Sequence, residues 1–197
     1  IFRHLDGIAT APTAFALYKK GILDYLLERE TIDLKTLSEK FNANEGYLNV
    51  ALRILCSQGW LNQDIDPSTN TITYTTNSNS KKAFSLAPMY EDSVNLIKYA
   101  VKFPEERIGP DAFNALARVF KHFESNMGLT NVGSDPIEYQ VLKHVEGIIA
   151  APIIVMLGMN GMFHKYFMEA SFRAQEYHQD PESFKKILDF LSHLGWF

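Results

Sequence analysis

The sequence predicts a mainly α fold: a winged helix-turn-helix with a small β-hairpin wing, a helical insert, and a second, diverged half-repeat without a wing. Three observations predict this fold. Helical and strand patterns follow one another as helix, helix, helix, strand, turn, strand. Two sequence blocks recur late in the chain. The chain has 197 residues, of which 46% are hydrophobic and 21% charged, and a chain of this length and composition can bury a core.

The first unit is predicted over residues 1–90. Residues 7–27 have helical apolar spacing, with a break at Gly21. Asp33 and Asn44 are good N-caps for helices over 34–41 and 45–58. Gly59 favours a helix end, and a strand then begins at 60–61. The turn-forming residues 64–70 and the β-branched run 71–75 complete the hairpin.

A helical insert is predicted over residues 91–142. A polar loop over 77–82 precedes it. Helices are expected over 93–103, where Pro104 follows, and over 111–124. After a loop over 125–135, Pro136 can occupy the first turn of a long helix.

The second half-repeat, residues 143–197, resembles the first unit in two blocks. The segment Arg3-His4-Leu5-Asp6-Gly7-Ile8 is similar to Lys143-His144-Val145-Glu146-Gly147-Ile148, and Gly59-Trp60-Leu61 is similar to Gly195-Trp196-Phe197. His4 and His144 are therefore equivalent, and we interpret both as structural. The repeat stops where its wing would begin, and the chain starts at Ile1, so we expect a fragment of a longer protein.

Charge and composition exclude several classes of function. The net charge of −4 does not favour a polyanionic partner. The single cysteine, Cys56, excludes an internal disulfide and favours a reducing, cytoplasmic location. The longest apolar run, 147–159, contains Pro152 and is too short to span a membrane.

A winged helix usually suggests a DNA-binding transcriptional regulator, and that alternative stays open. The helix that would enter the major groove carries Arg53 but also Glu45, and the wing carries Asp64 and Asp66. Because DNA affinity depends on Lys and Arg neutralising phosphates, this pattern argues against nucleic acid. A non-enzymatic protein-interaction module is a further alternative.

The first 90 or so residues resemble a known family. Residues 7–11 and 16–26 are similar to the opening of the N-terminal domain of S-adenosylmethionine-dependent methyltransferases, and 34–41, 47–55, 59–61 and 70–76 continue the resemblance in order. With its duplicated copy and insert, the chain looks most like the helical region before the catalytic core of C-methyltransferases in loading modules of bacterial polyketide synthases, of the apratoxin type.

This resemblance implies an accessory role in assembly and as a lid. The parent enzyme would transfer a methyl group from S-adenosylmethionine to an acyl group on a carrier protein. Its catalytic core, in the same polypeptide, is the expected partner, with acyl carrier protein as a second candidate. The chain lacks the acidic-x-Gly-x-Gly turn that such enzymes use for the cofactor, so we expect it alone to be inactive and not to bind the cofactor.

No catalytic, cofactor or metal residue is predicted. The histidines lack the His-x-x-x-His spacing of common metal sites, and Cys56 lacks a basic neighbour that would activate it. Met159, Met162, Phe163 and His164 are the positions that we predict to face a substrate. The competing interpretation is a buried helix, because methionine-rich helices commonly fill cores.

Overall fold

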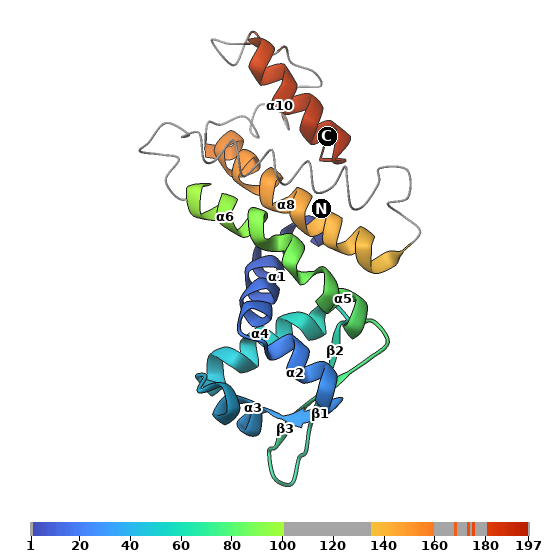
Figure 1. Cartoon of the computed structure of the whole chain (residues 1–197). Helices are drawn as coiled ribbons and strands as arrows, with labels where there is room; N and C mark the ends of the chain where they lie inside the picture. Colours follow the sequence, from blue (N-terminus) through green and yellow to red (C-terminus); the bar gives the residue numbers. More distant parts are fainter. Residues whose placement is uncertain are drawn as a thin grey trace.

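The computed structural model describes residues 2–100, 135–159 and 181–196, together with the single positions 168, 173 and 175. The winged-helix unit forms one end of the molecule, α8 crosses α1 above it, and α10 lies beyond α8 (Figure 1). The predicted helix over 111–124 and the loop over 125–134 lie outside the described residues.

The first helical stretch is two helices, α1 (Phe2–Lys19) and α2 (Ile22–Arg29). Gly21 separates them with a φ of 73°, a conformation that glycine adopts without steric cost. The predicted break is therefore confirmed. Ala11, Ala14 and Leu17 of α1 are buried in the main core.

The winged helix follows in the predicted order. It contains β1 (Thr31–Asp33), α3 (Leu34–Phe41), α4 (Glu45–Ser57), β2 (Leu61–Ile65) and β3 (Ile72–Thr76). Asp33 accepts a hydrogen bond from the Thr36 backbone N–H at 2.8 Å, and Asn44 accepts one from Tyr47 at 3.0 Å. Both predicted caps are confirmed.

The sheet has three strands rather than the two of the predicted hairpin. Its order is β1-β3-β2, with both pairs antiparallel. Ile32 lies opposite Tyr74, and Gln63 lies on the other side of Tyr74. A three-residue strand such as β1 has no sequence period to reveal it, and only its pairing with β3 defines it.

The predicted loop over 77–82 is wrong from Ser80 onward. Helix α5 (Ser80–Leu86) begins there and leads through the 3-10 helix η1 (Ala87–Tyr90) into α6 (Glu91–Ala100). The buried Ser80 hydroxyl donates to the Trp60 carbonyl and accepts from the Asn77 backbone N–H at 2.8 Å. These contacts hold the start of α5 beside Trp60, the residue that precedes β2.

The repeat has matching helices. Helix α8 (Pro136–Met159) ends at the position equivalent to the end of α1, and α10 (Pro181–His193) begins and ends at the positions equivalent to those of α4. Gly59 and Gly195 have φ values of 74° and 78°. Each glycine is followed by a tryptophan. The backbone N–H of that tryptophan donates, at 3.0 Å, to the backbone carbonyl of the leucine five residues before it. The boundary that the sequence predicts between the helical insert and the half-repeat, at 142–143, lies inside α8.

The core is shared between the units. Val141, Val145 and Ile148 of α8 belong to the same buried cluster as the leucines of α2, α3 and α4. A smaller cluster joins α8 to α10 through Ala150, Leu157, Phe184 and Leu191. None of the helices in the described part of the chain is long and apolar enough to cross a membrane.

Candidate functional site

A network of buried, hydrogen-bonded side chains lies where α1 crosses α8. Gly7 and Gly147, which are equivalent in the repeat, stand at the crossing. A Cβ atom on Gly7 would lie 2.5 Å from the His144 Cα, and one on Gly147 would lie 2.6 Å from the His4 Cα. Only glycine therefore permits this backbone approach.

His144 is enclosed by hydrogen-bonding partners from the first unit. Its Nδ1 lies 2.7 Å from the Tyr90 hydroxyl, and its Nε2 lies 3.1 Å from Gln58 Oε1. The Gln140 amide donates to the same Gln58 oxygen at 2.9 Å and accepts from the Trp60 indole at 2.9 Å. His144, Tyr90 and Trp60 are fully buried.

The network defines the protonation of His144. Gln58 Oε1 is an acceptor, so His144 Nε2 carries the proton and Nδ1 accepts from the Tyr90 hydroxyl. Burial lowers the pKa of His144 to about 4 and raises that of Tyr90 well above its usual value. At neutral pH each of these groups is uncharged and partnered.

His4 occupies the equivalent position with different partners. Its Nε2 lies 3.2 Å from Glu146 Oε2, to which Lys143 donates at 2.6 Å. Burial is the main cause that lowers the pKa of His4, against the opposing effect of Glu146. The imidazole stacks on Trp196 with ring centroids 5.8 Å apart and planes 13° from parallel. His4 Nδ1 and Trp196 Nε1 are buried and have no hydrogen-bond partner in the described structure.

The two units exchange their aromatic partners. His144 of the second unit packs against Trp60 of the first, with ring centroids 5.8 Å apart. His4 of the first unit stacks on Trp196 of the second. The sequence shows that the two histidines and the two tryptophans are equivalent. It contains no signal that each histidine would meet the tryptophan of the other unit.

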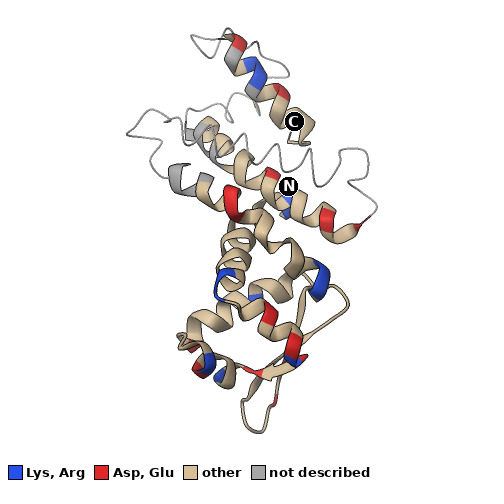
Figure 2. Ribbon diagram, viewed as in Figure 1, with Lys and Arg blue, Asp and Glu red and all other residues tan. Residues whose placement is uncertain are grey.

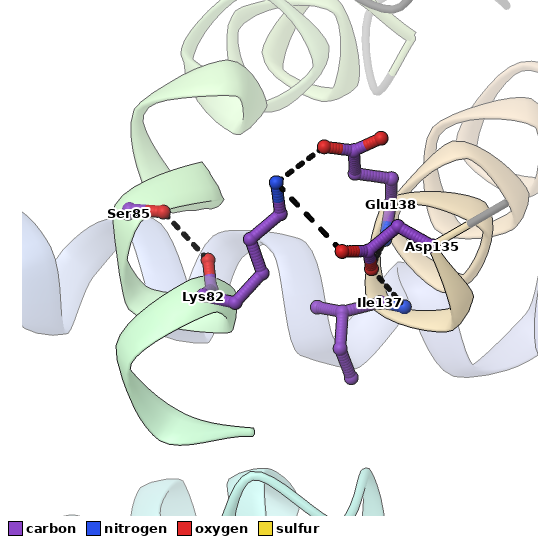
Figure 3. A network of polar contacts seen from close by, with 5 residues as sticks. All are labelled: Lys82, Ser85, Asp135, Ile137 and Glu138. Atoms are coloured by element: carbon purple, nitrogen blue, oxygen red, sulfur yellow. Dashed lines mark hydrogen bonds and ion pairs between the residues drawn. The ribbon is translucent and has the colours of Figure 1, made fainter. Parts of the chain in front are cut away.

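A second polar cluster holds the start of α8. Asp135 accepts hydrogen bonds from the backbone N–H groups of Ile137 at 2.8 Å and Glu138 at 3.1 Å, as an N-cap does. Lys82 on α5 reaches across to Glu138 and, at 3.8 Å, to Asp135 (Figure 3). The pair of carboxylates raises the pKa of Lys82. This cluster fixes α8 against α5.

The outer face of α4 carries exposed apolar side chains beside one basic residue, Arg53. Tyr47 is 81% exposed, Val50 is 57% exposed, and Ile65 of the wing is 52% exposed. Basic and acidic residues alternate along the ribbon of the winged helix in this view, without a stripe of one sign (Figure 2). Such a surface is a poor match for a duplex backbone.

A buried tyrosine fixes α4 to the wing. The Tyr74 hydroxyl donates to Asn49 Oδ1 and accepts from Gln63 Nε2 at 2.9 Å. Burial raises the pKa of Tyr74 to about 12, so the phenol stays neutral in any physiological range. These hydrogen bonds hold α4 against strands β2 and β3 of the wing.

The structure does not test the predicted substrate-facing residues. Met159 is the last residue of α8, and Met162, Phe163 and His164 lie outside the described residues. Within the described ranges, no group of three His, Cys, Asp or Glu residues could hold a metal ion. Burial raises the pKa of the Cys56 thiol, which makes it a weak nucleophile.

The fold and the helix crossing define a mainly helical, winged-helix protein. Residues 1–63 match a family model described as the AprA N-terminal domain, and residues 146–197 match one described as the AprA winged helix domain. The two matches show that these two segments resemble domains of the AprA type. No curated protein matches the chain significantly.

Proposed function

We propose that this chain is the accessory, non-catalytic region of an AprA-type C-methyltransferase that uses S-adenosylmethionine. The proposal is supported by the two AprA-type matches and by α8, which connects them: Ile148 lies in the main cluster, and Leu157 lies in the cluster with α10. Helix α8 therefore joins the two matched segments.

The proposed role is to assemble with the catalytic core and to cover its acyl substrate as a lid. The outer face of α4, which in DNA-binding winged helices enters the major groove, here carries exposed Tyr47 and Val50. Aromatic side chains at a protein surface are suited to protein contacts. The catalytic core in the same polypeptide is the proposed partner, with acyl carrier protein as a second one, in the cytoplasm.

The proposed chemistry belongs to the parent enzyme. Its substrate would be an acyl group on a carrier protein, in polyketide biosynthesis, and its methyl donor S-adenosylmethionine. Within the described residues no glycine-rich turn follows a strand in the way that this cofactor requires. Any metal would be held by the catalytic core.

Calorimetric titration with S-adenosylmethionine tests the proposal. The 197-residue chain is expected to show no binding at millimolar cofactor, and the polypeptide that includes the proposed core is expected to bind it and to methylate an acyl carrier protein. Failure of the longer polypeptide to bind the cofactor would contradict the methyltransferase assignment. Binding by the chain alone would contradict its non-catalytic role.

A gel-shift assay with random-sequence duplex DNA at low salt tests the DNA-binding alternative. We expect no nanomolar complex, and we expect Arg53→Ala to change nothing. A nanomolar complex that weakens with Arg53→Ala and with added salt would favour a transcriptional regulator instead.

A further inference from the structure

The exposed apolar residues on the outer face of α4 are not a requirement of the fold. In the second half-repeat, α10 begins and ends at the positions equivalent to those of α4. Where α4 exposes Val50 and Arg53, α10 exposes Lys186 and Asp189, which are opposite charges three residues apart on one helix face. This repeat therefore accepts a helix with charged residues on its outer face. Exposed Tyr47 and Val50 indicate an interface instead.

The outer face of α4 has a symmetrical order of residue types. Tyr47, Val50 and Arg53 are spaced three residues apart, and all three side chains are exposed. Because each residue of an α-helix advances by about 1.5 Å and turns by about 100°, Val50 lies midway between the other two, both along the helix axis and around it. An aromatic ring and a cation thus flank the central valine at equal separations.

Such a face is complementary to itself. When two copies of α4 lie antiparallel with their Val50 residues at a two-fold axis, Tyr47 of each copy stands level with Arg53 of the other. Each guanidinium can then lie over the other copy's ring in a cation–π pair, and the symmetry forms this pair twice. A two-fold contact uses the same patch on both chains and is closed by two copies. The antiparallel arrangement also places the helix dipoles in opposite directions, which is favourable.

We propose that the outer face of α4 is a dimer interface and that its occupant is a second copy of this chain. The inference rests on the proposed function only for the assembling role of this region. The catalytic core stays the partner proposed for the chain as a whole, and it would contact another face. The dimer would also cover the helix that a DNA duplex would need in its major groove.

Sedimentation velocity of the 197-residue chain, from micromolar to millimolar concentration, tests the proposal. We expect a reversible equilibrium between monomer and dimer. Val50→Lys puts at the two-fold axis the residue type that α10 carries at the equivalent position, so the variant should fold and stay monomeric. Lys186→Glu on α10 is the matched control and should dimerise as the wild type does. Circular dichroism verifies that both variants are folded.

Two substitutions of Tyr47 test the antiparallel register. Tyr47→Glu should retain the dimer, because a carboxylate level with Arg53 of the other copy replaces the cation–π pair by an ion pair. Tyr47→Lys should raise the dissociation constant of the dimer at least about tenfold, because two cation–π pairs are lost and like charges face one another. The opposite responses of these two variants are expected only where position 47 meets Arg53.

Three results would overturn the proposal. They are a chain that stays monomeric at millimolar concentration, a dimer that persists in Val50→Lys, and equal weakening of the dimer by Tyr47→Glu and Tyr47→Lys. The first result, together with protection of Val50 in the longer polypeptide alone, would assign this face to the catalytic core. None of these results changes the cofactor titration, so failure of the dimer and failure of the methyltransferase assignment are distinguishable.

Discussion

At the scale of single residues, the contact between α1 and α8 depends on the absence of two side chains. Gly7 and Gly147 each face the backbone of the opposite helix, beside His144 and His4. A backbone cannot move aside as the end of a flexible side chain can. The two glycines therefore set how closely the helices cross, and with it the contact of each histidine with its tryptophan.

Replacing either glycine by alanine should separate the helices. We expect Gly7→Ala and Gly147→Ala each to lower the free energy of unfolding by about 1–3 kcal/mol, as other overpacked sites do, despite alanine's better helix propensity. Urea unfolding followed by circular dichroism measures this. Gly46→Ala on α4 is the control: its Cβ atom would meet the Asn44 side chain at 3.3 Å. A Gly7→Ala protein as stable as wild type would refute the close crossing.

His144 should make stability depend on pH. Its pKa of about 4 in the folded state lies below the 6.5 of an unfolded histidine. Below pH 6.5 the unfolded chain binds a proton that the folded chain does not, so stability is complete above pH 6.5 and falls as the pH approaches 4. Between pH 7 and pH 5 we expect a loss of about 2 kcal/mol, to which the lowered pKa of His4 adds.

Urea unfolding at a series of pH values measures that slope. His144→Gln should remove most of it, and substitution of the exposed His193 by Gln should leave it unchanged. Equal slopes in the wild type and in His144→Gln would show that His144 is not held neutral by burial.

At the scale of elements, α8 begins where two kinds of interaction meet. Asp135 caps the helix and also faces Lys82 of α5. A helix cap contributes about 1 kcal/mol, and an ion pair between half-exposed side chains contributes less. The cap is therefore the stronger determinant of where α8 starts.

Three substitutions separate these contributions. We expect Asp135→Ala to lower the free energy of unfolding by about 1–2 kcal/mol, and Lys82→Met to lower it by less than about 1 kcal/mol. Lys81→Met, on the neighbouring exposed lysine, should change little. Urea unfolding gives all three values, and a larger loss for Lys82→Met than for Asp135→Ala would reverse the ranking.

The elements that the sequence predicts are those whose signals are local. Gly21, Asp33 and Asn44 mark helix ends by chemistry within a few residues, and the structure confirms all three. Strand β1 and the start of α5 at Ser80 depend on partners far along the chain, Tyr74 and Trp60. Sequence patterns do not report such contacts.

The same limit applies to the candidate site. The repeat shows from sequence alone that His4 and His144 are equivalent, and so are Trp60 and Trp196. Their pairing across the two units follows from how α1 crosses α8, which is a tertiary property. The predicted substrate-facing residues Met159, Met162, Phe163 and His164 stay a prediction.

At the scale of the whole molecule, helix α8 contributes to both buried clusters. Val141, Val145 and Ile148 of α8 are buried among residues of the first unit, and the same helix carries the small cluster with α10. Because α8 contributes residues to both clusters, the unfolding of one cluster is coupled to that of the other. The described parts of the chain should therefore behave as one cooperative unit.

NMR of the two tryptophan indoles during urea unfolding tests this coupling, since Trp60 reports on the first unit and Trp196 on the second. We expect one midpoint for both signals. Ile148→Ala, in the first cluster, should lower the free energy of unfolding by about 2–5 kcal/mol, and Phe184→Ala, in the second, should also destabilise the chain. Each substitution should shift both signals equally, because a cooperative unit loses stability as a whole. If Phe184→Ala shifted only the Trp196 signal, α10 would unfold by itself, and α8 would belong to the first unit alone.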